Sequence, residues 1–254
     1  MPSHAAERSG RLGVGIIGAG RVGPVFGAAL GNAGHAVVGI SAVSNASRDR
    51  ADAMLPGVPI LDIPDILERS ELVILAVPDA ELASLVAGLA ATGAWQQGQL
   101  VAHTAPSFGV GVLAPAQALG AIPLAIHPAM AFTGTSIDLI RLRESYCAVT
   151  AATVVQPIGM ALVVEMGAEP IIVAEADRPA YAEAIAIATS FSSAIVGQAT
   201  EALASIGVEN AGRILAPLVR SAVENALAAS TPDTIDLSAI GRDLTNGHQL
   251  EDDS

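Results

Sequence analysis

Three glycines near the start of the chain, Gly18, Gly20 and Gly23, constrain the fold more than any other feature of the sequence. They follow a short apolar run and precede a stretch with helical periodicity, in the spacing G-x-G-x-x-G. Gly18 suits the tight turn that leaves a buried strand, Gly20 leaves room for a pyrophosphate, and Gly23 lets the next helix approach the sheet. The free N–H groups at the start of that helix can bind phosphate. The predicted dinucleotide-binding loop comprises Gly18, Ala19, Gly20, Arg21, Val22 and Gly23.

The first half of the chain alternates short apolar runs with helical patterns, which is typical of a parallel sheet with crossover helices. Most of these runs are almost continuously apolar, as expected for strands that are covered on both faces. We therefore predict an α/β fold, with a Rossmann doubly wound parallel sheet over residues 11–146 as the NADP-binding domain. The predicted strands of this half span residues 12–18, 36–40, 58–61, 72–77, 100–103 and 123–127.

The second half predicts a smaller, mostly helical domain over residues 147–230, followed by a frayed acidic tail over residues 231–254. The segment 184–188 is apolar on every side, so we expect its own domain or a partner subunit to bury it. This part of the chain is therefore predicted to serve substrate binding and dimerisation in a homodimer. Its predicted elements are strands at 147–150 and 169–173, a helix between them at 154–166, and two long helices over 177–206 and 210–229.

The end of the second predicted strand indicates which dinucleotide the chain binds. NAD-binding proteins usually carry an acidic residue about twenty residues beyond the glycines, where it binds the ribose 2′-hydroxyl. The stretch from Gly39 to Arg48 contains no acidic residue. The hydroxyls of Ser41 and Ser44 and the guanidinium of Arg48 suit a 2′-phosphate, because guanidinium pairs with phosphate in bidentate fashion. We predict NADP rather than NAD, with the alternative that Arg48 is only a solvated residue of a surface helix.

Further candidate residues stand where predicted strands end, at the edge where open α/β sheets bind their ligands. Val77 and Pro78 end one strand and are predicted to contact the cofactor. Carbonyl reduction also needs a group that polarises or protonates the oxygen. All twelve basic residues are arginine, so lysine is excluded from this role. We predict that His127 orients or protonates the substrate oxygen, assisted by His103 and Thr104; the alternative for each histidine is a structural role at a strand end.

Two further points concern ligands. Gly134, Thr135 and Ser136 either bind a carboxylate through N–H and hydroxyl groups or form the turn before a helix. The spacing of histidines and acidic residues does not resemble a metal site, so no metal is predicted.

Charge and composition limit the partners. The formal net charge of −13 disfavours nucleic acid, which such an average field repels. The single cysteine, Cys147, fits a reducing compartment. The sequence shows neither a secretory signal nor a purely apolar run long enough to span a membrane. We predict a cytoplasmic protein that binds a small-molecule acid substrate and no nucleic acid or membrane.

Over roughly residues 11–230 the chain resembles a family of Rossmann-like oxidoreductases that carry a C-terminal helical domain of unknown function. The stretches that carry the resemblance are GIIGAGRVGP, SAVSNASRDRA, ELVILAVPDAEL, LVAHT, PLAIHPAMAFTGTS and LVVEMGAEP. The resemblance implies NAD(P)-dependent reduction and a helical second half that mediates dimerisation. Members often neighbour pantothenate-synthesis genes, which points to a ketopantoate-like oxo-acid. The chain is also similar to prephenate dehydrogenases, which implies that His127 of its His-Pro motif contacts the substrate.

The chain departs from the family pattern at three places. Ala105 and Pro106 follow His103 and Thr104 where members read His-Thr-Ser-Gly, and the family's Thr-Gly-Pro run after Ser230 is absent. A His/Asn-rich stretch of the family's first long helix is replaced at Ile187, Ser190 and Phe191. Two functions therefore stay open: an NADP-dependent oxidoreductase that reduces a small oxo-acid, or a catalytically silent NADP-binding sensor or assembly protein.

Overall fold

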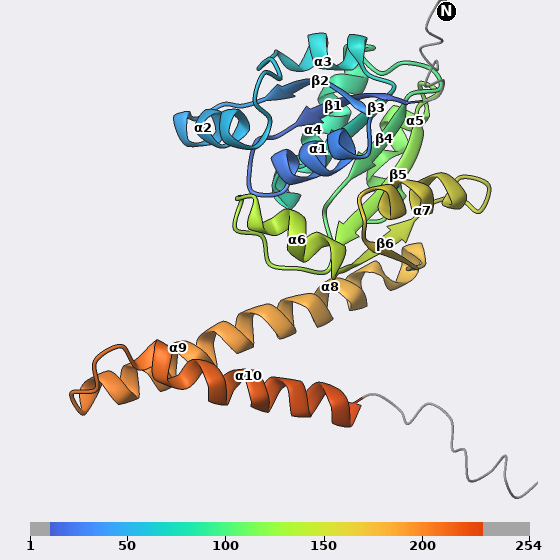
Figure 1. The fold of residues 1–254 in the computed structure, drawn as a ribbon. Coiled ribbons are helices and arrows are strands. Elements are labelled where there is room, and N and C mark those ends of the chain that lie inside the picture. Colours follow the sequence, from blue (N-terminus) through green and yellow to red (C-terminus); the bar gives the residue numbers. More distant parts are fainter. Residues whose placement is uncertain (1–10, 231–254) are drawn as a thin grey trace, which may run out of the picture. The chain divides into compact units, whose positions relative to one another are not determined.

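The structure, a computed structural model, describes residues 11–230 (Figure 1). The acidic tail expected over residues 231–254 lies outside the described residues. The chain forms two compact units, and the boundary between them falls between Thr189 and Ser190. The two units are described separately below.

The first unit is built on one seven-stranded sheet in the order β2-β1-β3-β4-β5-β6-β7. Neighbouring strands run parallel except β5 and β6, which are antiparallel. The predicted Rossmann sheet is therefore confirmed. Its strands are β1 (Gly13–Ile17), β2 (Ala36–Ser41), β3 (Leu72–Leu75), β4 (Leu100–His103), β5 (Ile122–Pro128), β6 (Tyr146–Thr150) and β7 (Glu169–Ile172).

The prediction of a strand at residues 58–61 is wrong, because only one isolated bridge, between Ile40 and Ile60, forms there. The local sequence explains the difference. Pro59 has no N–H to donate to a neighbouring strand, and Gly57 adopts a left-handed φ of 84°. The segment therefore touches the edge of the sheet beside β2 without continuing as a strand.

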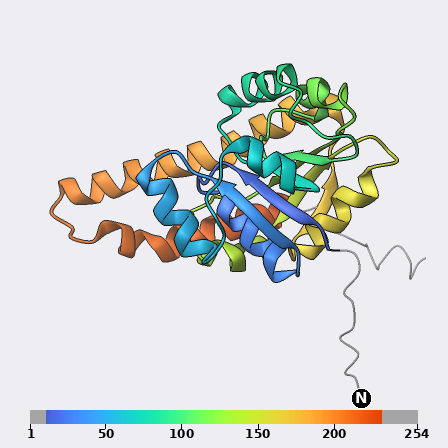
Figure 2. The ribbon, with the colours of Figure 1, turned by 90° about the horizontal axis from the view of Figure 1, so that it is seen from above.

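Helices cover both faces of the sheet, as Figures 1 and 2 show. On one face Ile16 packs in a core with Phe26 and Leu162. On the other, the neighbouring residue Ile17 packs with Leu82. Successive strand residues thus enter opposite cores, which is why the strands read as continuous apolar runs. The helices of this unit are α1 (Gly23–Asn32), α2 (Asn45–Met54), α3 (Ile63–Arg69), α4 (Asp79–Ala91), α5 (Ala114–Gln117), α6 (Ile137–Arg143), α7 (Gln156–Glu165) and α8 (Arg178–Ala186).

The first compact unit extends beyond the boundary expected at residue 146. Strand β6 pairs with β5, and β7 pairs with β6, so both belong to the main sheet. Cys147, Ala148 and Val149 are completely buried there, which ties this part of the chain to the first unit. The main sheet therefore continues past residue 146 and includes both β6 and β7.

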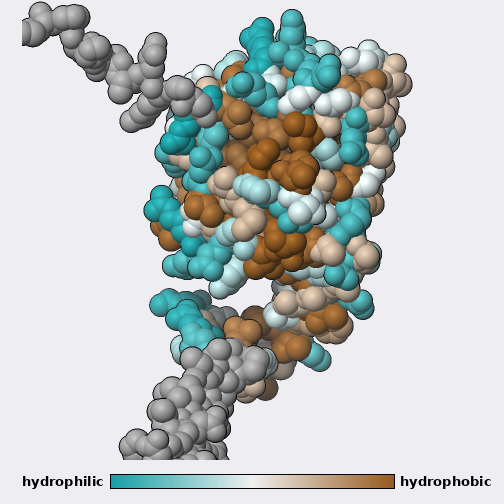
Figure 3. Space-filling model, turned by 90° about the vertical axis from the view of Figure 1, so that its right-hand side faces the viewer, coloured by the Kyte–Doolittle hydropathy of each residue, from teal (hydrophilic) through white to brown (hydrophobic). Residues whose placement is uncertain are grey.

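Apolar side chains remain exposed on the side of the first unit that carries α7. Figure 3 views this side and shows apolar surface within a polar surround. The exposed apolar residues of α7 and β7 are Ile158, Met160, Val164, Ile171 and Ile172.

The second unit contains two helices, α9 (Ser192–Ser205) and α10 (Ala211–Ser230), which pack against each other. Its apolar side chains are largely exposed in the single chain: Ile195 keeps 63% and Leu218 65% of its surface open. A cavity of about 310 Å³ between the helices is lined by apolar residues of both, including Val196, Val219 and Ala222. Among residues 190–230, the pair therefore leaves an apolar surface that no other described segment of this unit covers.

The helical stretch Glu175–Ser205 includes α8, a π-helical segment (Ile187–Phe191) and α9. It is long and apolar enough to span a membrane by length and composition, with a mean hydropathy of 1.3. Core helices of soluble proteins pass the same test, so the property is weak evidence for a membrane. The apolar segment 184–188, which was expected to be buried, is mostly exposed in the single chain.

Candidate active site

The glycine-rich loop adopts the conformation that its spacing predicts. Gly18 has a φ of 107°, in the left-handed region that favours glycine, and a Cβ there would collide with the carbonyl oxygen of Ala76. A Cβ on Gly23 would collide with the carbonyl oxygen of Gly18, so helix α1 begins as close to the loop as its backbone allows. A Cβ on Gly20 would meet no atom within 4 Å and would project into open space. The loop thus keeps room above Gly20 for a ligand.

A cavity of about 780 Å³ lies over this loop, between the ends of β1 and β3. In the sheet order this is where the chain changes direction, with β2 on one side of β1 and β3 on the other. Open α/β sheets bind their ligands at such a point. Seven of the residues predicted to bind the cofactor line the cavity, namely Gly18, Ala19, Gly20, Ser41, Ser44, Val77 and Pro78. The other four, Arg21, Val22, Gly23 and Arg48, do not line it.

The two predicted serines are held in place by the backbone. Ser41 Oγ accepts a hydrogen bond from the Gly18 N–H at 3.0 Å, which joins the end of β2 to the loop. Ser44 caps α2, and its Oγ accepts from the Ser47 N–H at 3.1 Å in a capping box. Arg48 follows on α2 as an exposed residue. The start of α2 therefore reaches the cavity, whereas Arg48 would have to fold back along the helix to do so.

Arg50, one turn further along α2 than Ser47, contacts the glycine-rich loop directly. Its Nη1 donates to the carbonyl oxygen of Ala19 at 2.7 Å. A Cβ on Gly134 would lie 2.9 Å from Arg50 Cδ and 3.2 Å from Arg21 Cγ, so both arginines pass beside the backbone of Gly134. Neither arginine has an ion pair with another described residue. Two uncompensated positive charges therefore lie beside the loop.

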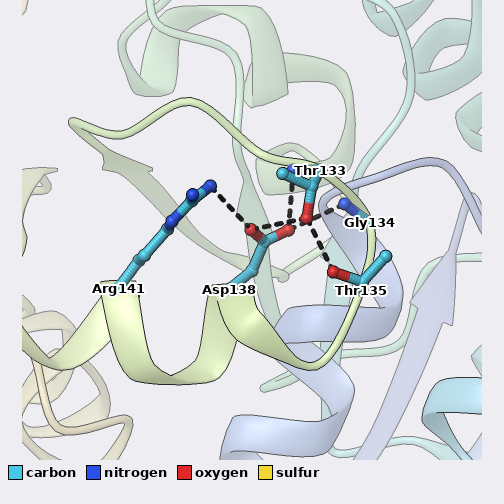
Figure 4. A network of polar contacts seen from close by, with 5 residues as sticks. All are labelled: Thr133, Gly134, Thr135, Asp138 and Arg141. Carbon is cyan, nitrogen blue, oxygen red and sulfur yellow. Dashed lines mark hydrogen bonds and ion pairs between the residues drawn. The ribbon is translucent and has the colours of Figure 1, made fainter. Parts of the chain in front are cut away.

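The loop at Thr133–Thr135 is organised around a buried carboxylate (Figure 4). Asp138 is completely buried and accepts hydrogen bonds from the N–H groups of Thr133 and Gly134 at 2.8 and 2.7 Å. Its other oxygen accepts from the Thr133 hydroxyl at 2.9 Å and lies 3.8 Å from Arg141. The donors at Thr133 and Gly134 are thus used within the protein, which favours the turn over the carboxylate site.

His103, at the end of β4, uses both ring nitrogens inside the protein. Nδ1 accepts from the Ala105 N–H at 3.2 Å, and Nε2 lies 2.8 Å from the carbonyl oxygen of Gly109. Burial lowers its pKa to about 4, so the ring is neutral and donates through Nε2. The loop that contains Gly109 is held by Glu175, whose carboxylate accepts hydrogen bonds from the N–H groups of Val110 and Gly111. These contacts favour a structural role for His103. The neighbouring Thr104 is almost buried.

His127, near the end of β5, contacts Tyr181 of α8. The Tyr181 hydroxyl lies 2.8 Å from His127 Nδ1, and the two rings meet edge to face at 5.5 Å. Burial, with the nearby Arg178 and His103, lowers the pKa of His127 to about 4. We assign the phenol as donor to Nδ1, because its alternative acceptor, the His127 carbonyl oxygen, is 3.5 Å away. The ring then carries its proton on Nε2. Tyr181 lies within the long helix that the sequence predicts over residues 177–206.

Arg178, the first residue of α8, is completely buried beside this pair. Its Nε donates to Thr150 Oγ1 at 2.7 Å, and its Nη2 donates to the carbonyl oxygens of Ala125 and Ala148 at 3.0 and 3.1 Å. Its Cζ lies 5.7 Å from the ring centre of Tyr181. Nη1 is buried without a hydrogen-bond partner. Nothing in the local sequence pattern around Arg178 indicates that its side chain is buried.

The fold and the cavity define a Rossmann-type α/β protein with a ligand pocket at its glycine-rich loop. The chain belongs to the family of the Rossmann-like domain, whose model matches residues 1–128, and residues 145–235 match a domain of unknown function, DUF2520. These matches confirm the resemblance to Rossmann-like proteins that carry a C-terminal domain of unknown function. No protein of curated function matches the chain.

Solved structures share the fold at low identity. A candidate NADP oxidoreductase from Bacteroides fragilis is 18% identical, with a TM-score of 0.72 over 92% of this chain and 90% of that one. An imine reductase from Streptomyces aurantiacus is 16% identical, with a TM-score of 0.65 over 91% and 78%. A pyrroline carboxylate reductase from Plasmodium falciparum, with NADP bound, is 11% identical, with a TM-score of 0.60 over 94% and 92%.

Proposed function

We propose that the protein is an NADP-dependent oxidoreductase that reduces the carbonyl group of a small oxo-acid, of which ketopantoate is one candidate. The observation that carries the proposal is the placement of the His127–Tyr181 pair. It lies at the same edge of the sheet as the cavity over the glycine-rich loop, because β1, β3, β4 and β5 are parallel and consecutive in the sheet. The structural neighbours that are named for NADP or for reductase activity support the same reading.

The residues around the cavity fit a dinucleotide phosphate. Gly20 leaves space where a larger side chain would block a pyrophosphate. Ser41, Ser44 and Arg48 are proposed to bind the 2′-phosphate, with the start of α2 beside them. Bound NADPH supplies the hydride.

The chain's own residues must then bind the carbonyl oxygen and deliver a proton. Neutral His127 offers its Nε2–H to that oxygen. As negative charge develops there, the Nε2 proton moves to the oxygen while the Tyr181 hydroxyl proton moves to Nδ1. The Nδ1 proton then returns to the tyrosine oxygen, and solvent supplies a new proton to Nε2. Arg178 favours this relay, because its positive charge opposes the burial that raises the pKa of Tyr181 to about 12. His103, whose two ring nitrogens are bonded within the protein, is proposed to support the end of β4, and Thr104 is proposed to assist His127.

We also propose that the protein is a homodimer through α9 and α10. The exposed apolar side chains of these helices and the apolar cavity between them would be covered by a second copy. A dimer interface explains why an acidic chain keeps so much apolar surface on one helical pair.

Oxidation of NADPH in the presence of small 2-oxo acids tests the proposed function. The expected result is a clear rate with at least one acid, reduced on the order of 10²–10⁴-fold in His127→Ala. The rival function, a catalytically silent NADP-binding protein, predicts cofactor binding without turnover on any acid of the panel. It draws support from Ile187, Ser190 and Phe191, which stand where the resembled family has polar residues.

A further inference from the structure

The guanidinium of Arg178 carries a buried charge that forms no ion pair with any carboxylate among residues 11–230. Its hydrogen bonds reach two backbone carbonyl oxygens and a threonine hydroxyl, all of them uncharged. The nearby carboxylate of Glu175 is engaged by the N–H groups of Val110 and Gly111. Buried charges in proteins are normally paired, because an unpaired one loses its hydration without compensation.

A merely structural role does not account for this charge. Neutral donors could equally join Ala125 of β5 to Ala148 of β6, and they would avoid the cost of burying a cation. Nη1 adds a second cost, since a buried charged donor without a hydrogen-bond partner among the described residues is strongly unfavourable. Both costs disappear if an anion from outside the protein binds Nη1.

The position of the arginine indicates which ligand this anion belongs to. His127 faces Ala148 in the β5–β6 register, and Arg178 donates to the carbonyl oxygen of that alanine. Tyr181 follows Arg178 by one helical turn, and its ring lies against the guanidinium. The unpaired donor therefore belongs to the same small region as the pair that would donate to a substrate oxygen.

We propose that Arg178 binds the carboxylate of the substrate through Nη1 and thereby selects anionic substrates at the His127–Tyr181 site. The proposal rests on the proposed function and adds to it the residue that recognises the acid. Tyr181 is only partly buried and lies beside the guanidinium, with the Arg178 Cζ 5.7 Å from its ring centre. A guanidinium suits this task because it holds a carboxylate with directed, charge-assisted hydrogen bonds.

The positive charge of Arg178 should favour the reduction of oxo-acids over the reduction of simple imines. An iminium substrate without a carboxylate brings a positive charge, which Arg178 would repel in a region of low dielectric constant. An oxo-acid brings the opposite charge to the same place. A site built around Arg178 therefore favours acids, including acids that also contain an imine, over simple imines.

A comparison of two small ligands of similar shape tests the proposal without turnover. Oxamate carries a carboxylate, and oxamide replaces it by a neutral amide. Titration calorimetry on the full chain saturated with NADP⁺ should show that oxamate binds about ten- to a hundredfold more tightly than oxamide. Arg178→Met should abolish this preference and leave the affinity for NADP⁺ within about twofold, because the glycine-rich loop is untouched.

Two results would overturn the proposal: equal binding of the two ligands by the wild type, or an unchanged preference in a folded Arg178→Met variant. If that variant does not fold, Arg178→Lys keeps the charge and loses the planar fork, and the preference should then fall about tenfold. A preference that Arg178→Lys leaves unchanged also counts against the proposal. Preferential binding of oxamate without turnover of any oxo-acid would contradict the proposed reduction and support the role of Arg178. Turnover of an oxo-acid without tighter binding of oxamate than of oxamide would support the reduction and contradict the role of Arg178.

Discussion

The hydroxyl of Tyr181 lies 2.8 Å from Nδ1 of His127, so that the start of α8 is joined to the end of β5 by one hydrogen bond. With the phenol assigned as the donor, Nδ1 of His127 is the acceptor in this bond. This assignment places the remaining N–H on Nε2, the nitrogen that no described protein group occupies. A chain without lysine thereby gains a neutral hydrogen-bond donor at a strand end where a reductase needs one.

The pH dependence of turnover should show that His127 acts as a neutral donor. Its pKa is lowered to about 4 by burial and by Arg178, so the active neutral ring persists well below pH 6. We expect kcat to stay flat from pH 8 to about 5 and to fall towards pH 4. A rate that instead declines as the pH rises through 6.5 would show that a protonated imidazole is the acid. Tyr181→Phe should lower kcat about two- to tenfold without moving the acidic limb far.

Stability should also depend on pH through the buried histidines. The pKa of His103 falls from 6.5 to about 4 on folding, so the unfolded chain binds more protons between these values. Its contribution to stability is therefore fully present above pH 6.5 and is lost as the pH falls towards 4. For His103 alone the loss amounts to about 3 kcal/mol.

Denaturant unfolding at several pH values measures this effect. The wild-type free energy of unfolding should decrease steeply between pH 6.5 and 4, and His103→Asn should show a shallower decrease because one of the two depressed histidines is gone. Parallel curves for the two proteins would show that His103 is not neutral in the folded state.

Cofactor preference should distinguish two arginines of α2. Arg48→Ala should weaken NADPH about ten- to a hundredfold and leave NADH unchanged, because only NADPH carries the 2′-phosphate. Arg50→Ala is the matched control: Arg50 holds the Ala19 carbonyl, so its loss should weaken both cofactors to a similar degree. Calorimetric titration of both cofactors measures all four affinities. An Arg48→Ala protein that keeps the wild-type preference would assign the 2′-phosphate to another group.

The sequence predicted much of the fold because its strongest signals are local. The tight turn requires the glycines at 18, 20 and 23, and burial on both faces requires continuous apolar runs. Seven strands were therefore predicted near their observed positions. The partners of the site could not be predicted in this way. Tyr181 and Arg178 reach His127 and Ala148 across 54 and 30 positions of sequence, and only the packing of α8 on the sheet brings them together. A helical pattern shows which residues share a face but not which strand that face meets.

Oligomeric state should follow from the apolar surface of α9 and α10. Light scattering at micromolar concentration should give twice the chain mass of 25.5 kDa. Leu218→Glu, which places a charge among exposed apolar side chains of α10, should shift the protein to monomer. Val154→Glu is the control, since Val154 is 86% exposed in a loop of the first unit and should leave the dimer intact. A wild-type monomer would remove the proposed interface.

The most direct test of the central claim is the rate of NADPH oxidation by the wild type and by His127→Ala across a panel of small 2-oxo acids. The variant keeps the glycine-rich loop and its cavity, so its NADPH affinity should match the wild type. We predict a clear wild-type rate with at least one acid and a loss on the order of 10²–10⁴-fold in the variant. A variant rate within threefold of the wild type would contradict the assignment of His127, and the absence of any wild-type rate across the panel would contradict the proposed reduction.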